Sequence, residues 1–411
     1  MDIDTLVNDP AITARIAALN KKTKLFSDII DNAGNQYVDL VMEGGGMLGI
    51  ALVGYTWALE QAGIRFLGVG GTSAGSINAL LVAALDVPAQ AKSPKLLQLL
   101  ASKDFFDFVD GDSDAVDFIE SWIQGAGKIK LAFKAAQVID TLNERWGLNP
   151  GRAFETWIRD ILAAENIHSL RDLRQRMNTL PDGLRERSGA LLDTPEKAAS
   201  RLAIVAADVA TESKIVFPDH ANLYYAEPDK VNPAAFVRAS MSIPYFFEPY
   251  KISPLPRDAA AEKRWQTVGY DSKKEKGGLP RYGLFVDGGI MSNFPIDLFH
   301  DYSAVPSAPT FGVKLQYDNR RRDIKGPLQL FAAIFNSSRH CLDYDFLHKN
   351  PDYRHLIQWI PCQQYNWLDF RMKEKDKAGL FREGALQALD FLEKFNWQAY
   401  KQLRETLIRT V

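Results

Sequence analysis

The sequence predicts an α/β fold with a mostly parallel central sheet flanked by helices. The stretch YVDLVME (37–43) has the pattern of a short buried strand, and a glycine-rich turn joins it to the apolar helical stretch LGIALVGYTWALEQAG (48–63). RFLGVGG (65–71) is a second strand, and the helical stretch SINALLVAALD (76–86) follows it. Strands and helices that alternate at this spacing imply right-handed crossovers between parallel strands. Four more short apolar runs predict further strands, at 201–210, 214–218, 282–289 and 310–315.

One elaborated α/β core, rather than two independent domains, accounts for the rest of the chain. The 411 residues are 46% hydrophobic and 24% charged, which is enough apolar material for a sizeable core. Two stretches are too polar and too rich in glycine to be expected in that core. We predict an N-terminal helical segment (1–36), a core (37–318) with a helical insertion (about 92–177) and polar surface loops (179–199 and 253–280), and a mainly helical C-terminal extension packed on the core (319–411).

Charge and cysteine content exclude several classes of protein. Lysine and arginine total 49 against 51 for aspartate and glutamate, so a dedicated nucleic-acid binder is not expected. Cys341 and Cys362 are too few for a disulfide scaffold and are not spaced as metal ligands. The first residues lack the basic start and apolar run of a signal peptide, and no run of about 18 apolar residues occurs. We therefore expect a cytoplasmic protein whose membrane contact is at most peripheral.

The glycine-rich turn EGGGMLG (43–49) allows two interpretations. Gly44, Gly46 and Gly49 fit the G-x-G-x-x-G spacing of a dinucleotide-binding turn. The same spacing fits a loop whose backbone N–H groups stabilise an oxyanion during acyl transfer. Both sites direct amide donors at negative charge near the start of a helix. The residues at the end of the second strand decide between the two interpretations.

The second strand ends in a nucleophile pattern. A dinucleotide site needs a carboxylate about 20 residues after the glycines, at the tip of the second strand. Instead, that strand runs into Gly71-Thr72-Ser73-Ala74-Gly75, a G-x-S-x-G pattern between a strand and a helix. This is the setting of a nucleophile elbow, in which Gly71 and Gly75 make room for the tight turn. We predict Ser73 as a nucleophile.

A serine nucleophile needs a base, and Asp287 is the first candidate. It ends the apolar stretch LFVDGG, where a buried strand would hold its carboxylate and partial desolvation would raise its basicity. An ordinary Asp-Gly turn has the same pattern. A Ser-Asp-His triad also stays open, because four histidines follow Asp287: His300, His340, His348 and His355.

Taken together, GGGMLG, GTSAG and DGG resemble the motifs of the patatin-like phospholipase family, in the same order. FVRASMSIPYFFEPY (236–250) and AADVATESKIVF (206–217) are also similar to segments of that family. The resemblance implies a Ser73–Asp287 dyad without histidine, an oxyanion hole of Gly44, Gly45 and Gly46 amides, and no metal or cofactor. It implies a phospholipid or lysophospholipid substrate, and an activating partner in some settings. Where the family usually has Arg or Lys before the last loop glycine, this chain has Leu48.

Membrane contact has its own sequence candidate. KIKLAFKAAQVIDTL (128–142) interleaves lysines with apolar residues, as an interfacial helix on anionic lipid does. An ordinary helix that buries one face gives the same pattern. A membrane-binding module without catalytic activity is therefore the rival to the enzyme.

Overall fold

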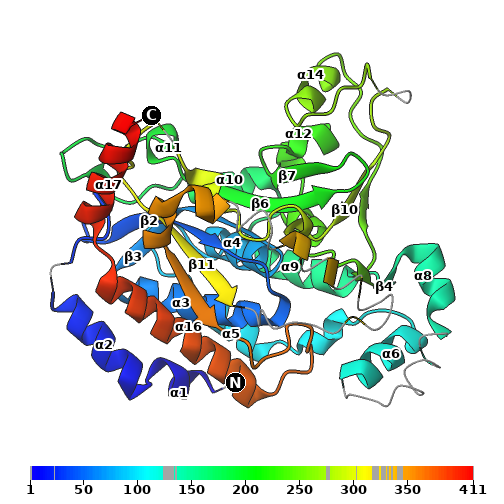
Figure 1. The fold of residues 1–411 in the computed structure, drawn as a ribbon, viewed down its shortest axis with the longest axis horizontal. Helices are drawn as coiled ribbons and strands as arrows, with labels where there is room; N and C mark the ends of the chain where they lie inside the picture. Colours follow the sequence, from blue (N-terminus) through cyan, green and yellow to red (C-terminus); the bar gives the residue numbers. More distant parts are fainter. Residues whose placement is uncertain are drawn as a thin grey trace.

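The computed structural model describes residues 2–22, 24–123, 134, 137–274, 278–301, 303–316, 324, 330, 333–334, 337–339 and 346–410. Within these residues the chain forms a ten-stranded mixed sheet with helices packed against it (Figure 1). The main path of the sheet runs β12-β11-β2-β3-β6-β10-β9, and its first four neighbouring pairs are parallel. The predicted fold class, a mostly parallel sheet flanked by helices, is confirmed.

The parallel part of the sheet contains the predicted strand–helix–strand units. α3 (Gly49–Gln61) connects β2 to β3, and α4 (Ala74–Ala84) follows β3. α3 and α4 pack against each other and against the sheet. The N-termini of both helices lie at the same edge of the sheet, because each helix begins shortly after the carboxyl end of its strand. The parallel strands are β2 (Gln36–Met42), β3 (Ile64–Thr72), β6 (Arg201–Asp208), β11 (Thr310–Gln316) and β12 (Ile357–Pro361).

In the antiparallel part of the sheet, the carboxyl end of β10 lies close to the carboxyl end of β3. β10 (Gly283–Val286) pairs antiparallel with β6, with Val286 opposite Ala207. β3 pairs parallel with β6, with Thr72 opposite Val205. β3 and β10 therefore run toward each other along β6, and each ends one residue short of Ala206. The other antiparallel strands are β1 (Ile29–Ile30), β5 (Arg185–Glu186), β7 (Ser213–Phe217) and β9 (Tyr250–Ile252).

The long C-terminal helix α16 (Glu374–Lys394) lies directly on α3 (Figure 1). α1 (Ile3–Val7) and α2 (Pro10–Asn20) pack against it, and α17 (Trp397–Thr410) follows it. Arg15 of α2 forms ion pairs with Asp390 and Glu393 of α16, at 2.6 Å and 2.8 Å. The N-terminal helices α1 and α2 are thus held against α16 on one side of the molecule.

In its described residues, the segment predicted as a helical insertion contains one short strand besides its helices. β4 (Gly147–Asn149) pairs with β8 (Tyr245–Phe247) in a separate two-stranded sheet. Three residues are too few for a periodic pattern, so the sequence predicts no strand here. The helices of this part are α5 (Ser93–Ser102), η2 (Phe105–Phe108), α6 (Ser113–Ile123), α8 (Ile139–Arg145), α9 (Arg152–Ala164) and α10 (Leu170–Met177).

Three other segments differ from the sequence expectations. The predicted polar loop 179–199 buries Leu184, Leu192 and Ala198 in a small second apolar cluster. The predicted polar loop 253–280 contains α14 (Ala261–Gln266), whose Trp265 is 1% exposed and packs on Tyr224. β12 adds a strand to the C-terminal extension, for which the sequence predicts mainly helix. In each segment a few apolar residues are buried among many polar ones, so composition concealed the packing. The predicted domain boundaries stay a prediction.

The remaining elements are short. They are η1 (Gly46–Leu48), α11 (Pro195–Ala198), α12 (Ala221–Tyr224), η3 (Pro228–Lys230), α13 (Ala234–Ser240), η4 (Gly288–Ile290), η5 (Ile296–Phe299) and η6 (Pro351–His355).

Candidate active site

Ser73 occupies the sharp turn between β3 and α4. Its φ of 52° and ψ of −122° are rare for a residue with a side chain, and such strain is typical of nucleophile elbows. A Cβ at Gly71 would lie 2.6 Å from the Met42 carbonyl oxygen, and one at Gly75 would lie 2.1 Å from the same atom. Both glycines therefore stand where the turn is packed too tightly against β2 for any side chain.

Ser240, at the end of α13, holds this turn in place. The Ser73 N–H donates a hydrogen bond to Ser240 Oγ at 2.9 Å, and the Ser240 hydroxyl donates to the Val205 carbonyl at 2.6 Å. Ser240 is fully buried and links the strained residue to β6. It lies in FVRASMSIPYFFEPY, which the sequence marks only as a family-like segment.

Asp287 meets Ser73 because β3 and β10 approach Ala206 of β6 from opposite directions, and each strand ends one residue short of it. The Asp287 side chain lies near the Ser73 hydroxyl and accepts the Gly289 N–H at 2.8 Å, and its own N–H donates to the Ser242 carbonyl. Asp287 is 2% exposed. Burial raises the pKa of its carboxyl above the usual value, although the charge of Arg339 and the hydrogen bonds from Ser73 and Gly289 oppose that rise.

The glycine-rich turn EGGGMLG (43–49), called the glycine loop from here on, lies beside Ser73. The hydrogen bonds of its peptide groups decide which of its N–H groups can contact a substrate. The Gly44 N–H donates to the Asn293 carbonyl at 3.1 Å, so it is not available to an oxyanion. Its predicted role as an oxyanion donor stays a prediction, and it would require this hydrogen bond to break. The N–H groups of Gly45 and Gly46 form no backbone hydrogen bond within the described residues. These two amides remain the available donors.

A buried ion pair between Glu43 and Lys314 lies at the start of the glycine loop. Glu43, fully buried, accepts hydrogen bonds from Lys314 Nζ at 2.8 Å, from the Leu315 N–H at 2.6 Å and from Asn293 Nδ2 at 3.1 Å. Lys314 in turn lies over the ring of Phe294. These contacts join the end of β2 to β11. The sequence shows Glu43 next to the glycines, but its hydrogen-bond partners could not be predicted because they lie 250 or more residues away.

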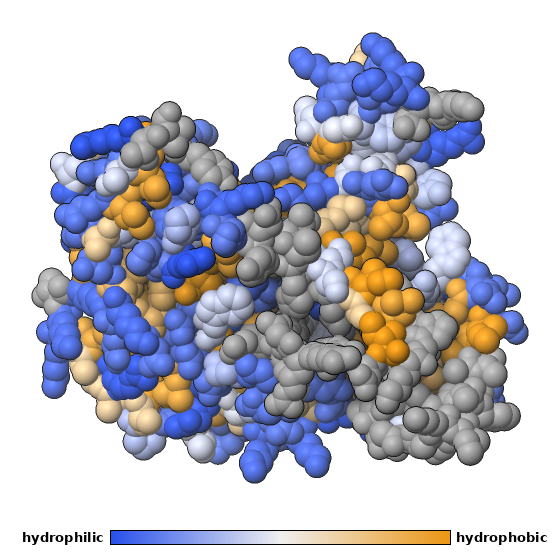
Figure 2. All heavy atoms as spheres, in the orientation of Figure 1, coloured by the Kyte–Doolittle hydropathy of each residue, from blue (hydrophilic) through white to orange (hydrophobic). Residues whose placement is uncertain are grey.

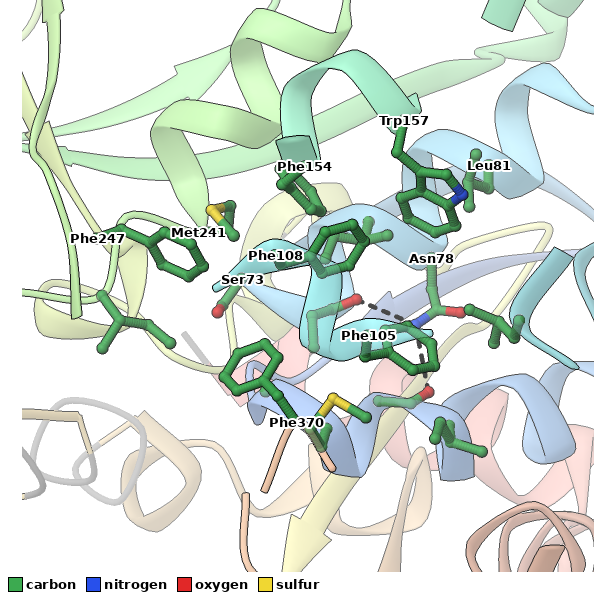
Figure 3. Close-up of a pocket in the computed structure, with 18 of the residues that line it drawn as sticks. Ser73, Asn78, Leu81, Phe105, Phe108, Phe154, Trp157, Met241, Phe247 and Phe370 are labelled. Atoms are coloured by element: carbon green, nitrogen blue, oxygen red, sulfur yellow. Dashed lines mark hydrogen bonds between the residues drawn. The ribbon is translucent and has the colours of Figure 1, made fainter. Parts of the chain in front are cut away.

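An apolar pocket opens from Ser73 (Figure 3). It encloses about 670 Å³ of empty space, part of it open to solvent. Apart from Ser73, Asn78 and the Trp157 indole N–H, the side chains that line it are apolar. The Ser73 hydroxyl points into the space that Met241, Phe247 and Phe370 surround (Figure 3). Further along, the pocket wall consists of Leu81, Leu96, Phe105, Phe108, Phe154 and Trp157.

No histidine of the described part of the chain lines this pocket. His300 instead packs its ring on Tyr353, and burial lowers its pKa to about 4. His355 lines a different hollow, formed with α16 and α17. His340 lies outside the described residues, as does most of the lysine-rich stretch 128–142. The triad interpretation therefore gains no support from the histidines whose positions are described.

The described residues contain neither a membrane-spanning helix nor a metal-binding cluster. None of their helices is both long enough and apolar enough to cross a bilayer. They also contain no cluster of three His, Cys, Asp or Glu side chains arranged to hold a metal ion.

One protein family and one curated relative match more than half of this chain. The sequence profile of patatin-like phospholipases matches residues 40–300. An uncharacterized protein of Bacillus subtilis (strain 168), YqhO, is 30% identical over 364 residues, which are 88% of this chain and the whole of that protein.

Solved structures give weaker similarities. VipD of Legionella pneumophila matches at 15% identity with a TM-score of 0.39, over 92% of this chain and 72% of VipD. A chain of the ExoU–SpcU complex from the type III secretion system of Pseudomonas aeruginosa matches at 17% identity with a TM-score of 0.35. That match covers 88% of this chain and 52% of the other, so this chain spans about half its length.

Proposed function

This chain belongs to the patatin-like phospholipase family, and we propose that it is a serine acyl hydrolase that cleaves phospholipid or lysophospholipid esters. The observation that carries the proposal is the position of Ser73 at the end of an apolar pocket, with the buried carboxyl of Asp287 beside it. The pair supplies a nucleophile and a base, and the pocket supplies an apolar surface for an acyl chain.

The reaction follows from the positions of these groups. Ser73 Oγ attacks the ester carbonyl carbon while its proton passes to Asp287, and the Gly45 and Gly46 N–H groups stabilise the tetrahedral oxyanion. The C–O bond to the alcohol then breaks, and the alcohol leaves with the proton from Asp287. Water attacks the acyl-enzyme, Asp287 takes its proton, and the fatty acid is released as Ser73 regains its hydrogen.

Fatty-acid release from mixed phospholipid vesicles tests this function. We expect release by the wild-type protein and loss of release in Ser73→Ala and Asp287→Asn. If the wild type releases no fatty acid and a fluorophosphonate probe does not label Ser73, the proposal that the protein is a serine hydrolase is rejected. Vesicle binding without turnover would then favour the membrane-binding module. Turnover by Asp287→Asn would show that another residue is the base, and it would favour the alternative in which a histidine takes that role.

We further propose that the protein acts in the cytoplasm as a peripheral membrane protein and contacts lipid next to the pocket. Trp146 is 55% exposed and Tyr245 is 49% exposed, although aromatic side chains of this size are usually buried. Gly147, next to Trp146, pairs with Tyr245 between β4 and β8, and Phe247 of β8 lines the pocket. Figure 2 shows apolar side chains gathered in the region where β4 and α8 lie in Figure 1. Tryptophan and tyrosine favour the interface between lipid and water.

Binding to sedimented vesicles tests this contact. We expect the double variant Trp146→Ser/Tyr245→Ser to bind vesicles more weakly while it still hydrolyses a water-soluble short-chain ester. Leu191→Ser, which removes a side chain that is 56% exposed in the segment 179–199, is the matched control. Equal loss of binding in both proteins would contradict a specific contact.

A further inference from the structure

The glycine loop has no cation of its own, yet a buried arginine from far along the chain contacts it. Residues 43–49 (EGGGMLG) contain no lysine or arginine. Arg339 is 3% exposed, and its Nη2 donates a hydrogen bond to the Gly44 carbonyl oxygen at 2.9 Å. Its Nε and Nη2 also donate to Asn293 Oδ1, at 3.2 Å and 2.9 Å. A guanidinium is costly to bury, so this placement needs a reason.

Contact with the Gly44 carbonyl determines where the next N–H points. In a trans peptide the C=O of one residue and the N–H of the next point in opposite directions. By holding the Gly44 carbonyl, Arg339 fixes the direction of the Gly45 N–H, which has no backbone partner among the described residues. The Gly46 N–H is fixed in the same way, because the Gly45 carbonyl accepts the Leu48 N–H at 3.1 Å.

The other contacts of Arg339 strengthen this hold. Asn293, which accepts from Arg339, donates to Glu43 Oε1 at 3.1 Å and to the Gly44 carbonyl at 3.3 Å. The Arg339 guanidinium lies 5.3 Å from the ring centroid of Trp367, whose backbone carbonyl accepts the Met47 N–H at 2.9 Å. Arg339 and Trp367 both lie beyond the segment 40–300 that matches the family.

Arg339 also acts on Asp287 through its charge. Its positive charge lowers the pKa of Asp287 and opposes the rise that burial causes. The other groups that act on Asp287 are the Ser73 hydroxyl and the Gly289 N–H, through hydrogen bonds. Arg238, a second buried cation of this region, bonds to Ser242 and to the carbonyls of Pro150 and Glu248. Arg339 is thus the described cation whose charge lowers the pKa of Asp287.

We infer that Arg339 is a positioning residue of the reaction, which orients the Gly45 N–H toward the oxyanion and places a positive charge near Asp287. The inference rests on the proposed function, and it assigns to the C-terminal extension a part in assembling the site. Arg339 is not one of the residues that line the apolar pocket, so we expect it to act on the reacting groups rather than on the acyl chain.

Two measurements on Arg339→Gln test the inference. In steady-state hydrolysis we expect kcat to fall about 10- to 100-fold with KM within about threefold, since a misdirected donor weakens transition-state stabilisation. The acid limb of the pH profile should move to higher pH, because loss of the cation raises the pKa of Asp287. Arg339→Lys should keep the acid limb near that of the wild type while kcat still falls, because a single ammonium cannot reproduce the forked contact.

The second measurement does not need activity. In protein labelled with ¹³C at aspartate carboxyls, the Asp287 signal is assigned by its loss in Asp287→Asn, and its pKa is compared between the wild type and Arg339→Gln. A higher pKa in Arg339→Gln supports the inference even if the proposed substrate is wrong. An active wild type with unchanged kcat and unchanged Asp287 pKa in Arg339→Gln would overturn the inference and leave the proposed function standing.

A matched control separates these effects from the loss of any buried arginine. Arg404 is 4% exposed, pairs with Asp352 at 3.1 Å and lies in α17, away from the glycine loop. Arg404→Gln should lower the melting temperature without moving the acid limb. If Arg339→Gln does not fold, Arg339→Lys provides the same comparison of kcat. A shift of the acid limb in Arg404→Gln equal to that in Arg339→Gln would also overturn the inference.

Discussion

At the scale of single residues, the strain at Ser73 depends on Ser240. A left-handed φ at a residue with a side chain costs about 1–3 kcal/mol and persists only where the surroundings impose it. Here the Ser73 N–H and the Val205 carbonyl both bond to Ser240 Oγ. No other side chain of the described residues bonds to both.

We therefore predict that Ser240→Ala lowers both stability and activity. The change leaves a buried N–H and a buried carbonyl without this partner, which costs about 1–3 kcal/mol. A displaced Ser73 should lower kcat about 10- to 100-fold. Urea denaturation and ester hydrolysis measure the two effects. Ser213→Ala, which removes a hydroxyl bonded to the Thr211 carbonyl, is the control, and an equal loss of activity there would count against a special role for Ser240.

Asp287 gives a prediction about pH and stability. Because burial raises its pKa, the folded state binds this proton more tightly than the unfolded state does. The carboxyl therefore contributes stability below its unfolded pKa of about 3.9, and that contribution is lost as the pH rises through the folded pKa. Asp287→Asn should gain melting temperature relative to the wild type as the pH rises above about 4. A difference that does not vary with pH would contradict this explanation.

The sequence could locate Ser73 and Asp287, but not the residues that hold them. Ser73 and Asp287 stand in short local patterns next to glycines at the ends of apolar strands. Ser240 lies 167 residues from Ser73, and Arg339 lies 295 residues from Gly44. No local spacing connects residues so far apart. The use of the Gly44 N–H within the fold likewise depends on Asn293, which lies 249 residues away.

At the scale of elements, the pocket runs along α4. Ser73 is the N-cap of this helix, and Leu81 lines the pocket about eight residues further on, roughly 12 Å along the axis. Figure 3 shows Leu81 and Trp157 on the opposite side of the pocket view from Met241 and Phe247. An acyl chain whose ester lies at Ser73 would therefore extend toward Leu81.

This geometry predicts selectivity for acyl-chain length. Leu81→Phe should reduce kcat/KM about tenfold for a long-chain ester while it leaves a butyrate ester almost unchanged, because only the long chain reaches the filled space. Leu81→Ala should not reduce long-chain turnover in this way. Hydrolysis of a matched series of esters measures the effect. Equal loss for short and long esters in Leu81→Phe would show that the chain lies elsewhere.

Element prediction succeeded where a pattern was long enough to be read. β2, β3, β6, β7, β10 and β11 all overlap predicted apolar runs. β4, β5 and β8 have two or three residues each, too few for alternation to be recognised. The sequence does not predict β12, because IQWIP is short, does not alternate strictly between buried and exposed residues, and ends in proline, which is uncommon inside a strand. Its position beside β11 comes from tertiary pairing.

At the scale of the whole molecule, α16 fixes the position of α3 and so of the glycine loop. α3 begins at Gly49, the last residue of EGGGMLG. A Cβ on Gly54 would lie 2.0 Å from the Phe381 carbonyl oxygen, and a Cβ on Gly384 would lie 1.9 Å from the Ala51 carbonyl oxygen. The two helices therefore cross with their backbones in contact, which only glycine permits. The C-terminal extension thus supports the loop both through Arg339 and through this crossing.

The crossing predicts opposite outcomes for one substitution at two positions of α16. Gly384→Ala must push the helices apart, and we expect it to cost about 1–3 kcal/mol in the free energy of unfolding and to lower kcat, because α3 carries the loop. Gly379→Ala meets only the hydroxyl end of Tyr365, at 2.4 Å, which can move aside. It should be neutral or gain up to about 1 kcal/mol from the better helix propensity of alanine. Urea denaturation and vesicle hydrolysis of both variants measure the contrast. If Gly384→Ala and Gly379→Ala had the same free energy of unfolding and the same kcat, the backbone contact between α3 and α16 would not be what holds the glycine loop in place.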